Sequence, residues 1–160
     1  MIRKLLAAAL AVVLSLALPA SALAADISII AANVAPGADA VTQTGTAGEA
    51  LTAGKAVYKK AADNKWYLAD CNSATAEVRA ASGITLTGSA AGQPVVVQTG
   101  GSITIGGTVA NGVVYYLSGT AGGIRPVADN TTGDYPQTIG MATSSTVVKL
   151  NFALRTGTAL

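Results

Sequence analysis

Histidine is absent from the 160-residue sequence, and cysteine occurs once, at Cys71. The absence of histidine removes the side chain that most often serves as a general base and as a metal ligand. A single cysteine cannot form an intrachain disulfide, and without a C-x-x-C pair it indicates neither a zinc site nor a redox motif. The sequence therefore excludes histidine-based catalysis and a fold stabilised by internal disulfides.

Charged and aromatic residues are also scarce, at 11% and 4% of the chain. Few ion pairs are therefore available at the surface, and the core must be built from Val, Ile and Leu. The 18 glycines and the many threonines favour short strands joined by tight turns over a helix bundle. We expect an all-β fold, a compact β-barrel or sandwich of about eight to ten short strands built from two similar sub-units.

A hydrophobic leader occupies residues 1–24. Arg3 and Lys4 precede an apolar run over residues 5–18, and Ala22-Leu23-Ala24 forms a small-residue cleavage site, which is the pattern of a secretory signal peptide. Cleavage after Ala24 would leave eight basic and eight acidic residues, so no basic patch indicates nucleic acid. If the leader is retained, it is an apolar arm that needs a hydrophobic place to lie.

The rest of the chain contains an apparent duplication. Residues 52–70 align with residues 110–129, and residues 83–100 align without a gap with residues 140–157. The order and spacing of these segments predict two copies, 43–100 and 101–157, within a β domain over residues 43–160. Residues 25–42 would form an N-terminal arm or strand. The alternative is that glycine-rich β sequences align with themselves by chance.

Each copy is expected to contain a hairpin, then a short strand and a longer one. The hairpins turn at Asp63-Asn64 and at Gly122-Gly123, because Asn and Gly tolerate positive φ. The last strand, residues 148–155, alternates most clearly. Its large apolar side chains, Val148, Leu150, Phe152 and Leu154, point one way, and the residues between them point the opposite way, which predicts one buried face.

Reactive side chains are few. Asp70 and Asp129 occupy equivalent positions in the two copies, and a pair of carboxylates is the machinery of a glycosidase, but a shared turn explains the match without catalysis. Cys71 without a histidine fits a small half-buried thiol, and the glycines of residues 119–124 lack the Lys-Ser/Thr of a phosphate loop. We expect no catalytic residue, no metal and no cofactor.

The candidate partner contacts are aromatic. Two adjacent pairs, Trp66-Tyr67 and Tyr115-Tyr116, lie on predicted strands, so one ring of each pair should be in the core while the other faces outward. An outward ring could stack on a sugar or anchor a protein, although packing at the core or edge is the alternative. The polar N-terminal segment and the C-terminal "TGTAL" also suggest arms that add strands to neighbouring subunits.

Four stretches, "AGEALTAGKAVYK", "AAGQPVVVQTGGSITIG", "GVVYYLSGTAGGIRPVAD" and "YPQTIGMATSSTVVKLNF", resemble the small β-rich capsid decoration (cement) proteins and head-fibre domains of tailed bacteriophages. The resemblance covers about residues 43–157. It implies a non-enzymatic protein on the capsid exterior of the virion, a homotrimer that bridges major capsid protein subunits. It also implies contacts through the segment after residue 25 and the hairpin of residues 118–126, which includes Ile124 and Arg125.

The leader leaves a second interpretation open. Phage heads assemble in the cytoplasm, so a decoration protein would keep its leader as an arm. A cleaved leader instead indicates a secreted or surface-attached bacterial β-module for adhesion or glycan binding, with no membrane contact after cleavage. A secreted hydrolase that uses Asp70 is the third alternative.

Overall fold

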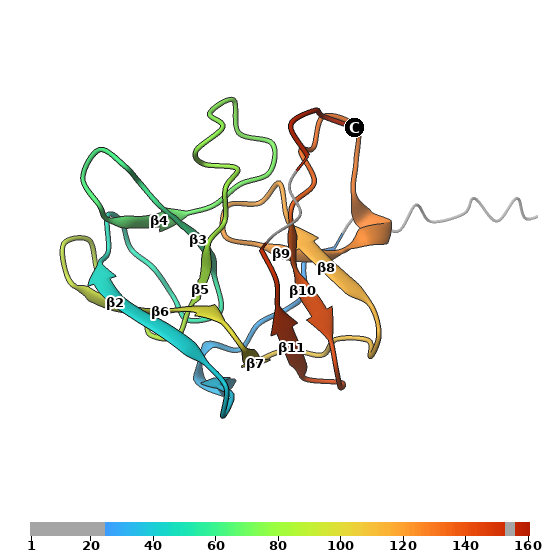
Figure 1. Ribbon diagram of the computed structural model, residues 1–160, viewed down its shortest axis with the longest axis horizontal. Coiled ribbons are helices and arrows are strands. Elements are labelled where there is room, and N and C mark those ends of the chain that lie inside the picture. Colours follow the sequence, from blue (N-terminus) through green and yellow to red (C-terminus); the bar gives the residue numbers. More distant parts are fainter. Residues whose placement is uncertain (1–24, 153–155) are drawn as a thin grey trace, which may run out of the picture.

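The computed structural model describes residues 25–152 and 156–160 of the chain; the leader and residues 153–155 lie outside this part. The described residues form two antiparallel sheets packed together, so the all-β fold is confirmed. Figure 1 shows β2 to β6 on one side of the molecule and β8 to β11 on the other, with β7 between them.

The first sheet has five strands in the order β2-β6-β5-β3-β4. Their bounds are Val41–Thr46 (β2), Ala56–Lys59 (β3), Trp66–Leu68 (β4), Gly83–Thr85 (β5) and Pro94–Gly100 (β6).

The second sheet has six strands in the order β1-β7-β11-β10-β8-β9. Their bounds are Val34–Pro36 (β1), Ser102–Ile105 (β7), Val114–Leu117 (β8), Ile124–Pro126 (β9), Thr138–Ala142 (β10) and Val147–Leu150 (β11). Two 3-10 turns, Ala31–Asn33 (η1) and Val127–Asp129 (η2), complete the secondary structure of the described residues.

The two sheets have matching strand orders once β1 is set aside, with β2 corresponding to β7 and β3 to β8. Pairing registers match too. Val57 lies opposite Leu68 in the first sheet and Tyr115 opposite Pro126 in the second, so both partners are displaced along the chain by the same number of residues. A duplicated unit would give this arrangement. The boundaries at residues 43–100 and 101–157 remain a prediction.

The ungapped alignment of the last strands is wrong. Ile84 of β5 lies opposite Gln98, whereas Met141 of β10 lies opposite Lys149, because the turn between β10 and β11 is shorter than the loop between β5 and β6. Strand β11 also ends at Leu150, earlier than predicted, and the rest of the predicted strand runs into residues 153–155, outside the described part. Within β11 the predicted alternation holds, with Val148 and Leu150 buried and Lys149 exposed.

The sheets are completed in two different ways. After β2, Ala47 forms a parallel bridge with Trp66, and the Gly48 amide donates to the Trp66 carbonyl at 2.8 Å. At the matching carbonyl of the second sheet, that of Ile124, the donor is the amide of Ile27 at 2.8 Å. The first sheet is therefore closed by its own chain after β2, and the second by the N-terminal segment.

Neither described tail extends away as an arm. The Ile30 amide donates to the Gly106 carbonyl at 2.8 Å, which holds the N-terminal segment beside β7. At the other end, the Leu160 amide donates to the Asp134 carbonyl at 2.9 Å, and the Thr156 amide to that of Pro136 at 3.0 Å. Both described tails thus find hydrogen-bond partners on their own chain, and the addition of strands to neighbouring subunits stays a prediction.

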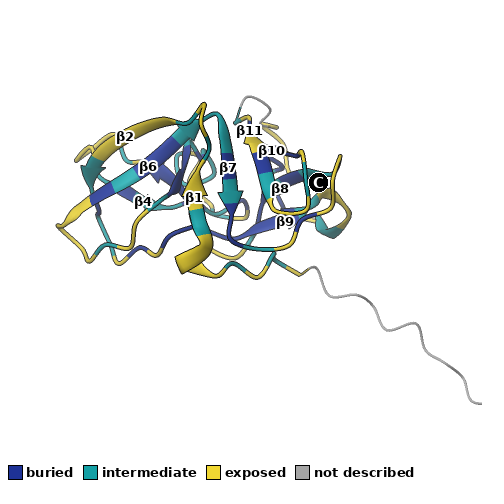
Figure 2. Ribbon diagram, turned by 90° about the horizontal axis from the view of Figure 1, so that it is seen from below, coloured by how far each residue is buried: buried dark blue, intermediate teal, exposed yellow. Residues whose placement is uncertain are grey.

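The main apolar core lies between the sheets and draws on both of them, as the dark blue segments of Figure 2 show. Its largest fully buried side chains are Ile84 from the first sheet and Ile103, Ile105, Leu117, Ile124 and Ile139 from the second. A smaller core fills the first sheet alone and consists of Ala47, Leu51, Val57, Trp66, Val95 and Val97. As expected from the composition, branched aliphatic residues supply most of this apolar volume.

The smaller core requires a glycine at position 45, since the indole of Trp66 lies directly against it. A methyl group at Gly45 would overlap Trp66 Nε1, and that ring is buried and cannot move into solvent. We expect Gly45→Ala to lower the free energy of unfolding by about 1–3 kcal/mol, as overpacked cores do. Urea denaturation followed by Trp66 fluorescence measures it.

Gly88→Ala is the matched control. Its added methyl would meet only the Leu51 carbonyl oxygen, at 3.6 Å, so its free energy of unfolding should change by less than about 0.5 kcal/mol. Equal stabilities of the two variants would contradict the close packing of Trp66 on β2.

Candidate functional site

The structure places the six candidate contact residues unequally. Trp66, Tyr115, Ile124 and Arg125 are buried, whereas Tyr67 and Tyr116 are half-exposed. Each adjacent aromatic pair thus contributes one ring to the interior and one toward the surface, as the strand alternation predicts. A partner could reach only Tyr67 and Tyr116 without local unfolding.

Tyr67 is itself held by its own chain. Its hydroxyl donates to Asp63 Oδ2 at 2.7 Å, and Lys60 Nζ lies 5.2 Å from the ring centroid. The hydrogen bond raises the pKa of Tyr67 and lowers that of Asp63. These contacts with the turn between β3 and β4 explain the position of the Tyr67 ring without a ligand.

The hairpin of residues 118–126 offers little contact surface. Only Thr120 and Ala121 at its tip are exposed, while Ser118 and Gly122 to Arg125 are buried. Arg125 was predicted to face a partner, but it is turned inward. The guanidinium forms an ion pair with Asp134, which lies in the irregular segment between β9 and β10. The sequence of that segment has no periodic pattern from which this ion pair could be predicted.

Asp134 is the centre of a buried polar cluster. Beside Arg125, it accepts hydrogen bonds from the Thr131 amide at 2.6 Å and hydroxyl at 2.9 Å, and from the Cys71 thiol at 3.3 Å. Burial opposes ionisation, but these four donors outweigh it and hold the pKa of Asp134 below its ordinary value. Asp134 is therefore a carboxylate that fixes a loop.

Cys71 is unsuited to nucleophilic chemistry. Burial, reinforced by the neighbouring Asp134 carboxylate, raises the pKa of the thiol to about 12. The thiolate is the reactive form of cysteine, and it is scarcely populated near neutral pH at that pKa. Its contacts with Asp134 and with Arg125 Nη2, both at 3.3 Å, make it part of the buried cluster.

The two matched acids, Asp70 and Asp129, bind backbone amides of separate segments. Asp70 Oδ1 accepts from the Asn72 amide at 3.0 Å, and Asp129 Oδ2 accepts from the Ala25 amide at 3.3 Å. Over residues 25–152 and 156–160, no three His, Cys, Asp or Glu side chains come together in a way that could hold a metal ion. Asp70 therefore stabilises a local turn, and Asp129 holds the N-terminal segment.

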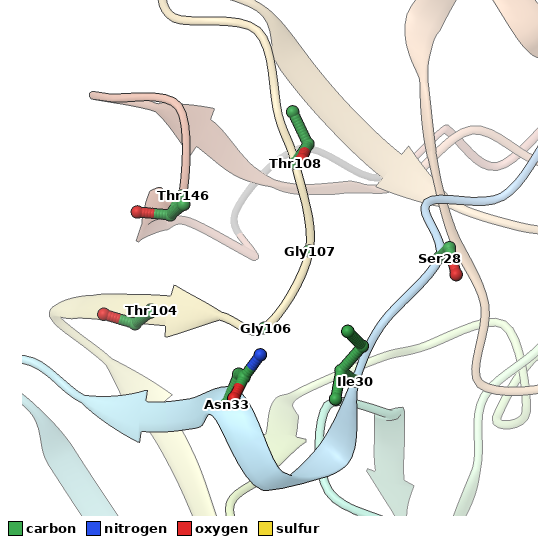
Figure 3. A pocket seen from close by; sticks show the side chains of 8 residues that line it. All are labelled: Ser28, Ile30, Asn33, Thr104, Gly106, Gly107, Thr108 and Thr146. Atoms are coloured by element: carbon green, nitrogen blue, oxygen red, sulfur yellow. The ribbon is translucent and has the colours of Figure 1, made fainter.

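One surface hollow, of about 400 Å³, lies between the N-terminal segment, the end of β7 and the turn before β11. Figure 3 shows its lining, in which hydroxyl and amide side chains surround a backbone strip of two glycines: Ser28, Ile30, Asn33, Thr104, Gly106, Gly107, Thr108 and Thr146. None of these residues is ionisable. The hollow can hold a neutral polar group but supplies no acid, base or nucleophile. No local pattern in the sequence indicates this hollow, because its residues come from three distant segments.

No protein-family model, no curated protein and no solved structure matches this chain. Within the described residues, no helix has the length and apolar character needed to cross a bilayer.

The buried pair of Arg125 and Asp134 generates a stability prediction. Removing one partner leaves the other charge buried, so Asp134→Asn should lower the free energy of unfolding by about 3–5 kcal/mol at pH 7. Since the native pKa of Asp134 is lowered, its contribution is present above the unfolded-state pKa of about 3.9 and is lost as pH falls below it. Denaturant titrations of both chains at pH 7 and pH 3 measure this loss.

Two further variants serve as controls for this experiment. Asp63→Asn alters an exposed carboxylate and should leave the free energy of unfolding at pH 7 nearly unchanged. Replacing both Arg125 and Asp134 by leucine should recover much of the stability lost in Asp134→Asn, since no unpaired charge then remains. A double variant less stable than Asp134→Asn would contradict the assignment.

Proposed function

We propose that the chain is a non-enzymatic structural protein that decorates the exterior of a tailed-phage capsid and bridges neighbouring subunits of the major capsid protein. The sequence resemblance to decoration proteins motivates this proposal. The observation that carries it is how the structure uses its few reactive side chains. Asp134, Arg125 and Cys71 are buried together, and Asp70 and Asp129 bind backbone amides of separate segments.

The architecture supports a mechanical role. Two sheets share one apolar core, and the described tails are bonded back onto the body, so a force applied at the surface is distributed over many ladder hydrogen bonds. A decoration protein must remain folded while the shell beneath it is under pressure. Cohesion of this kind needs no pocket and no cofactor.

The outer face of the N-terminal segment is the best candidate for the capsid contact. Ile30 is 59% exposed and is followed by exposed Ala31, Ala32 and Asn33, whereas the opposite side of the segment is bonded to Gly106 and Ile124. An exposed isoleucine on a firmly held segment gives apolar contact at little entropic cost. This region coincides with one of the two contact regions that the resemblance implies.

Co-sedimentation with heads assembled from the major capsid protein of the same phage tests the proposal. The chain should pellet with the particles, and Ile30→Glu should weaken binding by about tenfold or more because it places a charge in an apolar contact. Val127→Glu is the matched control, since Val127 is also exposed, at 49%, but lies in η2. A chain that stays in the supernatant under all conditions would overturn the proposal.

A secreted or surface-attached module that binds a glycan is the second candidate, and the hydroxyl-lined hollow of Figure 3 favours it. Neutral sugars are recognised by such hydroxyl and amide groups. For this candidate the intact mass of the product should correspond to a chain without residues 1–24. Asn33→Ala should lower the affinity for any glycan that a screen identifies. Trp66→Ala is unsuitable here, because the indole belongs to the core.

A further inference from the structure

Strand β2 is an open sheet edge without the usual protection. Its first four residues, 41–44, are all exposed, so both faces of the strand are in solvent there. Figure 2 shows β2 at the rim of the molecule, paired on one side with β6. Exposed edges are normally blocked by charged residues or proline, yet residues 40–48 contain neither. An unprotected edge of this kind is competent to pair with another strand.

The hydrogen bonds of β6 establish which backbone groups of β2 face outward. The Val96 carbonyl accepts from the Leu86 amide at 2.8 Å, and the Val96 amide donates to Thr87 Oγ1 at 3.1 Å, so both groups of Val96 face β5. Thr44 lies opposite Val96, and its amide and carbonyl therefore point away from β6.

The same alternation applies along the strand. The Ala47 amide donates to the Gln93 carbonyl at 2.9 Å, which places residues of odd number in hydrogen-bonded positions toward β6. Thr42 and Thr44 thus present their backbone amides and carbonyls at the free edge. No hydrogen bond from the described part of the chain reaches these groups on that side.

We propose that two copies of the chain associate through this edge, antiparallel, with a two-fold axis at Gln43. Thr42 of each copy then lies opposite Thr44 of the other, and each such pair exchanges two backbone hydrogen bonds. Gln43 faces its own symmetry mate at a non-hydrogen-bonded position, where side chains approach most closely. The two five-stranded sheets become one continuous sheet.

A second copy fits this edge because the strand is complementary to itself. An isologous contact brings the same strand of both copies together, so a strand with charge of one sign would repel itself, and this one carries no charge. Threonine across from threonine and amide across from amide are compatible pairs, since both offer a donor and an acceptor. Val41, 57% exposed, lies opposite Gly45 of the other copy, which has no side chain and leaves space for the valine side chain.

This association concerns the free chain and does not depend on the proposed function. It predicts a dimer as the solution species, in place of the trimer that the resemblance implies. Failure of the dimer would leave capsid binding untouched, and failure of co-sedimentation would leave the dimer untouched.

Disulfide trapping in the full chain tests the geometry. Cys71 is fully buried, so the thiol introduced by Gln43→Cys is the one that an oxidant can reach within the described residues. Mild oxidation at micromolar concentration should convert Gln43→Cys to a covalent dimer. The matched control, Met141→Cys, places a thiol on another exposed strand position, within the six-stranded sheet, and should form no covalent dimer. Equal trapping of the two variants would overturn the proposal.

The mass in solution, measured by light scattering after gel filtration, tests the association itself. The unmodified chain should elute at the mass of a dimer. Gln43→Lys sets two like charges face to face at the axis and should raise the dimer dissociation constant by about tenfold or more, whereas Met141→Lys should leave it unchanged. Circular dichroism verifies that both variants are folded. A monomeric unmodified chain, or a dimer that Gln43→Lys leaves intact, would overturn the proposal.

Discussion

The apolar core between the two sheets is the constraint on which the rest of the structure depends. Each sheet is too small to bury a sufficient core alone, and short sheets of this kind require a packing partner. Ile84 from the first sheet and Ile103 and Leu117 from the second are fully excluded from water in one common cluster. The two sheets therefore stabilise one another, and the surfaces left for contact with partners are their edges and outer faces.

Buried polar side chains bond to backbone groups and in this way hold irregular segments of the chain. The Gln137 side chain accepts a hydrogen bond from the Ala81 amide and donates one to the Ala81 carbonyl, each at 2.7 Å, as the backbone of a neighbouring strand would. The Gln98 amide nitrogen binds the carbonyls of Gly100 and Ser102 at 2.9 Å, which holds the turn from the first sheet to the second. Together with the ion pair of Arg125 and Asp134, these contacts attach the long loops to the sheets.

Local patterns in the sequence predicted several of the strands and turns, because their causes are local. The hairpin turn at Asp63-Asn64 was expected, and Asn64 has a positive φ. The alternation around Val148 likewise predicted its buried face. Long-range outcomes were out of reach. The inward position of Arg125 depends on Asp134, in a loop without periodicity, and the seating of the N-terminal segment depends on glycines far along the chain. The open edge at β2 required the register of β6 to be known.

Amide hydrogen exchange of the variant Ile103→Ala tests the shared core most directly. Removing this buried side chain should cost about 2–5 kcal/mol. If the core makes both sheets one cooperative unit, the slowest amides of β3 in the first sheet and of β8 in the second should lose protection by the same factor. A loss confined to the second sheet, with β3 amides as slow as before, would show that the sheets are independent and would contradict the account.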